Sequence, residues 1–153
     1  MLFLLFQLGP DRFALDIREV AEVLPLVELT RIPRAPPALA GILNHRGVPV
    51  PVIDLSQLLL ERAALRRLNT RIVIMHHTAH DGLTHLLGLI AEQMTETARL
   101  EPGAFTASGV TDPDSRHAGP VSIDSNGLIQ RIDVNRILPA SVRELLFQQY
   151  LIT

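Results

Sequence analysis

Cysteine is absent from this chain of 153 residues, and aromatic residues make up only 4% of it. The first absence excludes disulfide frameworks, thiol chemistry and zinc sites with cysteine ligands. The scarcity of aromatic rings leaves little surface on which nucleic-acid bases could stack. The formal net charge of −2 supplies no basic field for a phosphate backbone. We therefore expect no nucleic-acid partner.

Long hydrophobic runs are also missing. No stretch approaches the roughly 18 apolar residues that a membrane-spanning helix requires, so we expect no direct membrane insertion. The apolar opening, residues 1–6, has no basic segment before it and soon reaches the turn residues 9–11, which favours a buried strand over a signal peptide. Hydrophobic residues make up 47% of the chain, enough for one domain with a core of Leu, Ile, Val and Ala. We expect a cytoplasmic protein.

Residue patterns typical of catalysis are absent as well. The sequence contains neither a Gly-x-Ser-x-Gly elbow nor a glycine-rich phosphate loop, and its carboxylates are scattered. His76, His77, His80 and His85 cluster, but the first two would face opposite sides of a strand. We therefore predict no enzyme, no catalytic residue, no metal and no cofactor. A small metal-binding enzyme and a nucleic-acid-binding barrel are the alternatives.

Short apolar segments separated by turn residues predict a mainly β protein. Pro25 favours an edge position for its strand, because proline cannot donate to a ladder. Asp54 or Ser56 can cap a helix with an apolar stripe of Leu58, Leu59, Leu65 and Leu68. The expected strands of this first half are residues 2–8, 13–17, 20–27, 39–43 and 48–53.

The second half repeats the order of elements in the first. Asn126-Gly127 marks a hairpin turn, as does Asn44 to Gly47 earlier in the chain. The order predicts one domain over 1–153, built from two small five-stranded barrels that pack as one unit. The expected parts are lobe 1 (residues 9–70), lobe 2 (residues 71–138) and a C-terminal helix (residues 141–151) with a capping box from Ser141 to Glu144.

Three motifs are distinctive: Phe3-Leu4-Leu5-Phe6-Gln7-Leu8-Gly9, Gly41-Ile42-Leu43-Asn44-His45-Arg46-Gly47 and Val50-Pro51-Val52-Ile53-Asp54-Leu55. In this order and spacing they resemble the CheW-like coupling proteins of bacterial chemosensory signalling. The first half fits the family pattern without a gap, and the second half fits more loosely. The resemblance implies a mainly β fold of two interlocked five-stranded SH3-like β-barrel lobes with short helices and a C-terminal helix.

The resemblance also implies a function. Such proteins are scaffolds that join the regulatory CheW-like domain of a CheA-type histidine kinase to the cytoplasmic tip of a methyl-accepting chemoreceptor, and they catalyse no reaction. They associate with membrane receptor arrays only through these partners. The positions matching the family's receptor side are Ile17 and Arg71. Those matching its kinase side are Val20, Glu22, Gly41, Arg46 and Gly47, with an ion pair expected between Glu22 and Arg46.

The chain also departs from the family pattern. Arg71 stands where better-known members carry an apolar residue, His45 lies in the turn, and no lead-in precedes the first strand. With Thr95-Glu96-Thr97, these departures make the chain similar to the accessory coupling proteins of surface-sensing, Wsp-type pathways (WspB- or WspD-like).

Overall fold

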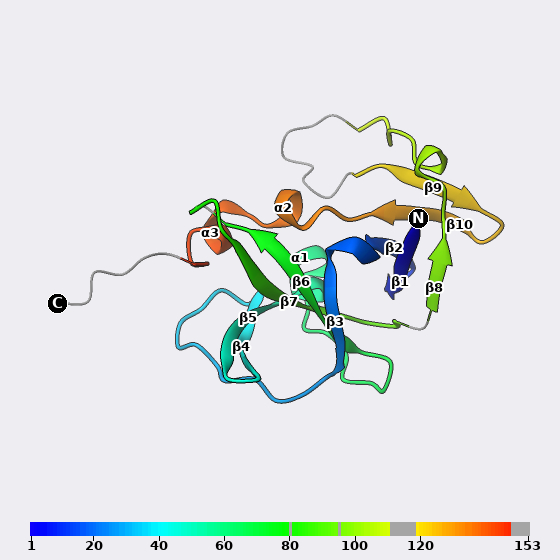
Figure 1. Ribbon diagram of the computed structural model, residues 1–153. Helices are drawn as coiled ribbons and strands as arrows, with labels where there is room; N and C mark the ends of the chain where they lie inside the picture. The colour runs from blue at the N-terminus through cyan, green and yellow to red at the C-terminus, as the bar shows by residue number, and fades with distance from the viewer. Residues whose placement is uncertain (80, 95, 111–118, 148–153) are drawn as a thin grey trace.

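The computed structural model describes residues 1–79, 81–94, 96–110 and 119–147, and they form two five-stranded sheets with short helices (Figure 1). The first sheet has the order β8-β1-β2-β10-β9, and the second has the order β3-β6-β7-β5-β4. The strands are β1 (Leu2–Leu8), β2 (Asp11–Asp16), β3 (Val20–Pro25), β4 (Leu39–His45), β5 (Val48–Asp54), β6 (Arg71–Thr78), β7 (Thr84–Ala91), β8 (Glu96–Arg99), β9 (Val121–Asp124) and β10 (Gly127–Arg131). The helices are η1 (Ile17–Glu19), α1 (Leu55–Leu60), η2 (Pro102–Ala104), α2 (Val134–Ile137) and α3 (Ala140–Arg143).

The two halves of the chain exchange strands. Each half gives its first two strands to one sheet and its remaining three to the other, so β1 and β2 lie in the first sheet while β3, β4 and β5 lie in the second. Both sheets have the same internal order, and each contains one parallel pair, β2 with β10 and β5 with β7. This confirms the repeat and the interlocked fold. The strands do not divide between the sheets at residue 70, as the expected lobes 9–70 and 71–138 require.

The second sheet curls until its edges meet. β3 pairs only with β6, which confirms the edge position expected from Pro25. Thr30, which follows β3, exchanges two backbone hydrogen bonds with Ile42 on β4, at 3.0 and 2.8 Å. Because β3 and β4 are opposite edges of the sheet, this bridge brings the two edges together and gives the sheet its barrel-like shape.

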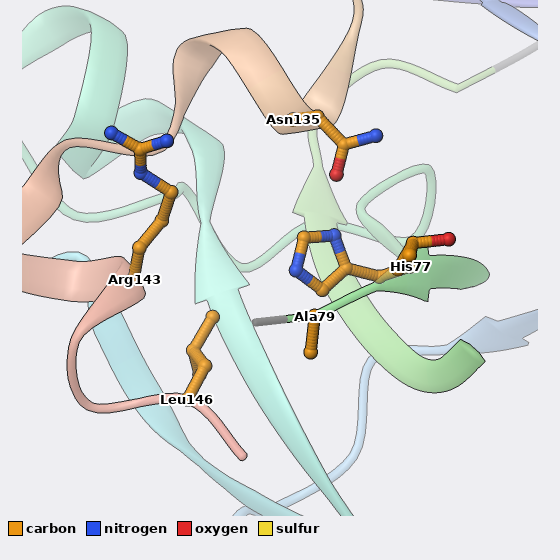
Figure 2. Close-up of a pocket in the computed structure, with 6 residues that line it drawn as sticks. His77, Ala79, Asn135, Arg143 and Leu146 are labelled. Carbon is orange, nitrogen blue, oxygen red and sulfur yellow. The ribbon is translucent and has the colours of Figure 1, made fainter. Parts of the chain in front are cut away.

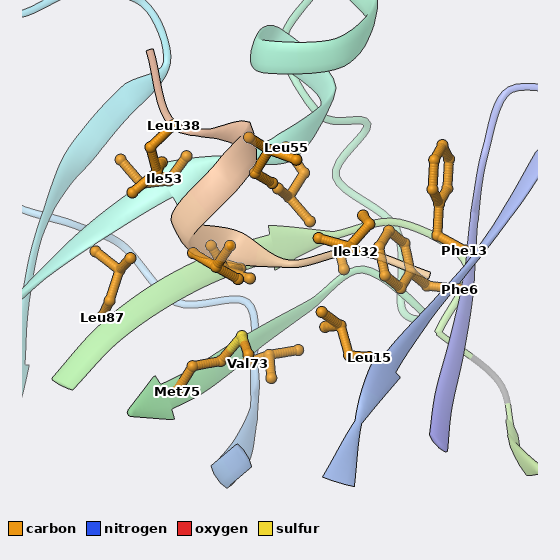
Figure 3. Close-up of a cluster of buried hydrophobic side chains, with 14 of the residues drawn as sticks. Phe6, Phe13, Leu15, Ile53, Leu55, Val73, Met75, Leu87, Ile132 and Leu138 are labelled. Atoms are coloured by element: carbon orange, nitrogen blue, oxygen red, sulfur yellow. The ribbon is translucent and has the colours of Figure 1, made fainter. Parts of the chain in front are cut away.

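A shared core joins the two sheets, and we use that name for the cluster in Figure 3. Phe6, Phe13 and Leu15 come from the first sheet, while Val73 and Met75 come from the second (Figure 3). Ile132, Leu138 and Leu55 fill the space between the sheets. Neither sheet by itself could shield these apolar side chains from water, so the two sheets stabilise each other.

Helix α1 begins where the sequence predicts and ends sooner. The Asp54 carboxylate accepts hydrogen bonds from the backbone N–H of Ser56 at 2.9 Å and Gln57 at 3.3 Å, so Asp54 is the cap. Glu61 then adopts a left-handed conformation, which terminates the helix. Leu65 and Leu68 therefore lie beyond the helix, and the expected stripe through them is wrong; Leu68 is 94% exposed.

Helix α3 also differs from expectation. It begins directly after Pro139, whose carbonyl accepts from Val142 and Arg143, so Ser141 lies inside the helix and cannot cap it. The expected capping box is therefore wrong. The helix ends at Arg143, short of the expected span of 141–151, and residues 148–151 of that span lie outside the described residues. No helix in the described ranges has the length and apolar composition needed to cross a bilayer.

Candidate protein-docking site

The turn between β4 and β5, residues Asn44–Gly47, presents the most exposed charge of the expected kinase-side residues. His45 pairs with Val48, so Arg46 and Gly47 form a two-residue loop in which both have positive φ, 54° and 84°. Such loops match the twist of a hairpin. The Asn44 side-chain oxygen accepts from the Gly47 N–H at 2.8 Å and fixes the loop. The turn therefore holds the Arg46 side chain, 77% exposed, away from the sheet.

Glu22 meets this turn from the opposite edge of the second sheet. One carboxylate oxygen accepts from Arg46 Nη2 at 3.2 Å, and the other lies 3.4 Å from His45 Nε2. A register shift between Val20 and Glu22 marks a bulge in β3 next to this contact. The expected ion pair is therefore present. An exposed pair of this kind contributes only about 0–1 kcal/mol to stability, so its main effect is to orient the two side chains.

Gly41 occupies a position that has no room for a side chain. Its φ is 154°, and a Cβ atom there would lie 2.6 Å from the Thr30 carbonyl oxygen and 3.0 Å from the Leu29 Cβ. That carbonyl belongs to the bridge that joins β3 to β4. Gly41 thus permits closure of the second sheet. Gly47 needs glycine only for its positive φ, since a Cβ there would meet nothing within 4 Å.

We expect Gly41→Ala to lower the free energy of unfolding by roughly 1–3 kcal/mol, because the added methyl group pushes against backbone atoms. Gly47→Ala is the matched control. It introduces an unfavourable left-handed conformation without a clash, so its cost should be about 1 kcal/mol. Urea denaturation of both variants measures the difference. An equal loss of stability in the two variants would contradict the role assigned to Gly41.

The other expected kinase-side residue, Val20, begins β3 and packs half-buried against the shared core. Val20 pairs with Met75 of β6, and it lies two residues before Glu22 in the sequence. Val20 is therefore near the ion pair along the same strand, but it supports the strand more than it presents a surface. The structure brings Glu22, Arg46 and Gly47 together where the two edges of the second sheet meet, and Val20 and Gly41 lie in the edge strands β3 and β4.

The expected receptor-side residues lie apart. Ile17 belongs to η1, just before Val20, and packs against the shared core. Arg71 begins β6 and pairs with Pro25. Val20 pairs with Met75, which is four residues, or about 13 Å, from Arg71 along β6. Ile17 comes before Val20, so Ile17 and Arg71 lie at opposite ends of the β3–β6 pair. They do not form one contiguous contact.

Asp16 fixes the segment that carries Ile17. Its carboxylate accepts from the Arg18 backbone at 3.0 Å, from Arg18 Nη2 at 2.8 Å and from Arg131 Nη2 at 3.3 Å. The hydrogen bonds from Arg18 hold the pKa of Asp16 below its usual value despite burial. Arg131 also lies over the rings of Phe3 and Phe105. Neither Asp16 nor Arg131 was expected from the sequence to be a positioning residue, although an Asp before a short helix is a cap signal.

The described histidines of the cluster lie on β6 and β7, and His77 and His85 lie near other protein side chains. His76 is exposed and His77 is buried, as expected from strand alternation. His77, Asn135 and Arg143 line a small cavity of about 210 Å³ (Figure 2). His85 lies 2.8 Å from an Asp81 carboxylate oxygen and stacks on Phe147, with the ring centres 4.2 Å apart. Among the described residues no three His, Asp or Glu side chains gather to hold a metal, and His80 lies outside them.

The fold is that of a known family of protein domains. The family model for the CheW-like domain matches residues 2–142, so the chain belongs to the CheW-like domain family. The scaffolding protein TtCheW from Thermoanaerobacter tengcongensis has a similar crystal structure, with a TM-score of 0.79 and 25% identity over 94% of this chain and 92% of that one.

Relatives in other bacteria agree with this assignment. The chain is 33% identical over 98 residues to the chemotaxis protein CheW of Klebsiella aerogenes, which covers 60% of this chain and 59% of that protein. It is 24% identical over 140 residues to the chemotaxis protein CheW of Rhizobium meliloti, covering 91% and 88% of the two chains. The chain thus spans somewhat less than two thirds of the Klebsiella aerogenes relative.

Proposed function

We propose that this protein is a non-enzymatic adaptor that couples methyl-accepting chemoreceptors to a CheA-type histidine kinase in a chemosensory array. The match of residues 2–142 to the CheW-like domain carries this proposal. The adaptor would act in the cytoplasm and reach the membrane only through its receptor partners. Its role requires binding surfaces and no reacting group.

The kinase-binding surface is the part of the second sheet around Glu22, Arg46 and Gly47. The turn of residues Asn44–Gly47, which we name the docking turn, is held by the Asn44 side chain. The Arg46 guanidinium is exposed and oriented by Glu22. A preformed turn loses little conformational freedom when a partner binds. Val20 and Gly41 lie in the edge strands β3 and β4 that meet at this surface. The partner surface is the regulatory CheW-like domain of the kinase.

We expect Arg46→Glu to weaken binding to that regulatory domain at least tenfold. The substitution places a carboxylate beside Glu22, removes the ion pair and reverses the charge of the exposed turn. Isothermal titration calorimetry with the full chain and the purified kinase domain measures the change in Kd. Binding of a receptor signalling fragment should stay unchanged in the same variant.

The double variant Glu22→Arg with Arg46→Glu is the control for this experiment. It restores an ion pair at the same place while keeping the reversed charge on the turn. Partial recovery of kinase binding would show that orientation matters, and no recovery would assign the effect to the Arg46 charge itself. Unchanged affinity for the Arg46→Glu variant, with its fold intact, would refute the proposed kinase surface.

The receptor-binding surface includes Ile17 and Arg71. Because these residues lie at the two ends of the β3–β6 pair, a receptor helix that contacts both must run along that pair. Ile17 supplies an apolar contact held in place by Asp16, and Arg71 supplies a cation that suits an acidic receptor position. The partner is the cytoplasmic tip of a methyl-accepting receptor.

We infer further that the pathway is of the surface-sensing, Wsp type. The support is Arg71, at a position that is apolar in better-known members, and His45, whose Nε2 lies 3.4 Å from the Glu22 carboxylate. A gene for a diguanylate cyclase response regulator next to the gene of this protein would support the subtype. A flagellar motor operon around it would argue against it.

A further inference from the structure

A second concave surface, which we name the connector groove, lies beside α1. It has a volume of about 780 Å³ and is bounded by the long connector between β3 and β4 on one side and by residues 63–66 on the other. Figure 1 shows the connector as the light-blue chain between these two strands. Apolar and polar groups both line it, and polar atoms contribute the larger part of its exposed surface. The lining aliphatic side chains and prolines are Leu26, Val27, Leu29, Ile32, Ala35, Pro36, Pro37, Leu39, Ala40, Ala63, Ala64 and Ile90.

The connector wall is stiff. Pro33, Pro36 and Pro37 fix their own φ angles, and backbone hydrogen bonds from Ala35 to Ile32 and from Leu39 to Pro36 close two turns between them. A wall of this kind keeps its shape without a ligand.

The opposite wall is tied to the sheet. The Asp54 carboxylate accepts from the Ala64 N–H at 2.9 Å. Arg62, just before this wall, donates to the buried Glu92 carboxylate at 2.9 Å, and Ser56 donates to the same carboxylate. Residues 62–64 are thus anchored to Asp54 at the end of β5 and to Glu92 directly after β7. With both walls held, the connector groove is preformed, which lowers the entropic cost of filling it.

Two arginines that have no side-chain partner in the described part of the chain line the connector groove. Arg31 and Arg66 line it, and the exposed Arg34 and Arg67 stand close by in sequence. Within the described residues, none of these four guanidinium groups forms an ion pair or a side-chain hydrogen bond. Of the two lining carboxylates, Asp54 is buried and occupied by three backbone N–H groups. Glu28 is therefore the one exposed carboxylate among the described lining residues.

We propose that the connector groove binds an extended acidic segment of a partner protein, with apolar side chains on the apolar floor and carboxylates facing Arg31 and Arg66. Arginine pairs with carboxylates in a bidentate geometry that suits this arrangement. A nucleic acid fits less well, because none of the described residues that line the groove has an aromatic ring to stack on a base. A membrane surface fits less well too, since concave apolar residues cannot insert into a bilayer.

The connector groove is separate from the docking turn. Leu39, in the groove, begins β4, and His45, in the turn, ends it, six residues or about 20 Å further along. An acidic segment could therefore occupy the groove while a kinase domain contacts Arg46. The proposal does not depend on the coupling function, and the failure of either leaves the other standing.

The test is selection of random octapeptides displayed on phage against the purified full-length protein. We expect the enriched peptides to combine Asp or Glu with Leu, Ile or Val. A synthetic consensus peptide carrying a fluorophore then gives a Kd by anisotropy. The double variant Arg31→Glu with Arg66→Glu should weaken that binding at least tenfold, and Arg31→Gln with Arg66→Gln should weaken it less, because the charge is removed without reversal.

Arg99→Glu is the matched control, because Arg99 is exposed on β8 in the first sheet and should not change peptide binding. Enrichment of peptides without acidic residues would overturn the proposal. Equal affinity of the consensus peptide for wild type and both arginine double variants would overturn it as well. The proposal would also be overturned if no acidic peptide bound and the wild type instead bound phosphatidylserine vesicles or a single-stranded oligonucleotide, with that binding lost in the arginine double variants.

Discussion

Replacing Leu15 with alanine is expected to lower the free energy of unfolding by about 2–5 kcal/mol. Leu15 has no exposed surface and extends from β2 of the first sheet into the shared core (Figure 3). The cavity left by the substitution is bounded by side chains of both sheets, so neither sheet can close it without moving the other. Because the chain has no tryptophan and one tyrosine, urea denaturation is best followed by far-UV circular dichroism.

Leu128→Ala is the matched control for this prediction, since Leu128 is 54% exposed on β10. Its stability should change by no more than about 0.5 kcal/mol. Both variants should unfold in one cooperative transition, because the two sheets share one core. If Leu15→Ala instead separated unfolding into two transitions, the sheets would be independent units and the shared core would not join them.

Local features of the fold were readable from the sequence. Asn44-His45-Arg46-Gly47 and Ser125-Asn126-Gly127 specify hairpins through glycine conformations and side-chain hydrogen bonds within a few residues. Pro25 specifies an edge strand because it lacks an N–H. The pairing of Ile129 with Arg12 joins residues more than a hundred positions apart, and no periodicity signals such a pair. The interlocking of the halves therefore came from family resemblance, because the repeat alone does not show which strands share a sheet.

The misplaced helices have a common cause. A stripe of Leu58, Leu59, Leu65 and Leu68 has approximately helical spacing. Glu61 adopts a left-handed conformation that ends α1, so Leu65 and Leu68 lie outside the helix. Ser141 and Glu144 have capping-box spacing, but Pro139 starts α3 earlier. In both cases backbone geometry at one residue overrode the side-chain pattern. Such geometry depends on how the segment packs, which the residues alone do not show.

The residues of the candidate site were likewise only partly predictable from the sequence. The Glu22–Arg46 pair joins opposite edges of a curled sheet, so only the family resemblance could place the two residues together. The resemblance could not show that Ile17 and Arg71 lie at opposite ends of β3 and β6. The connector groove has no recognisable sequence signature, because its walls are irregular segments.

Replacing Asp54 with alanine is expected to lower the free energy of unfolding by about 2–4 kcal/mol. The substitution removes the cap of α1 and also leaves the Ala64 N–H without its acceptor, so one wall of the connector groove loses its tie to the sheet. Burial raises the pKa of Asp54, although three backbone N–H groups favour its charged form. Asp54→Asn should lower the free energy of unfolding less, because its one amide oxygen can still accept a hydrogen bond either at the start of α1 or from the Ala64 N–H.

The repeat supplies the control. Asp133 occupies the same place in the second half as Asp54 in the first, but it is exposed and caps α2 by accepting only from the Asn135 N–H at 3.0 Å. Asp133→Ala should therefore cost about 0.5–1 kcal/mol, the ordinary value of an exposed cap. Urea denaturation of both variants compares them directly. An equal loss would mean that the Asp54–Ala64 hydrogen bond adds nothing. A larger loss for Asp54→Ala, with weaker binding of the acidic peptide, would show that the same carboxylate caps α1 and shapes the connector groove.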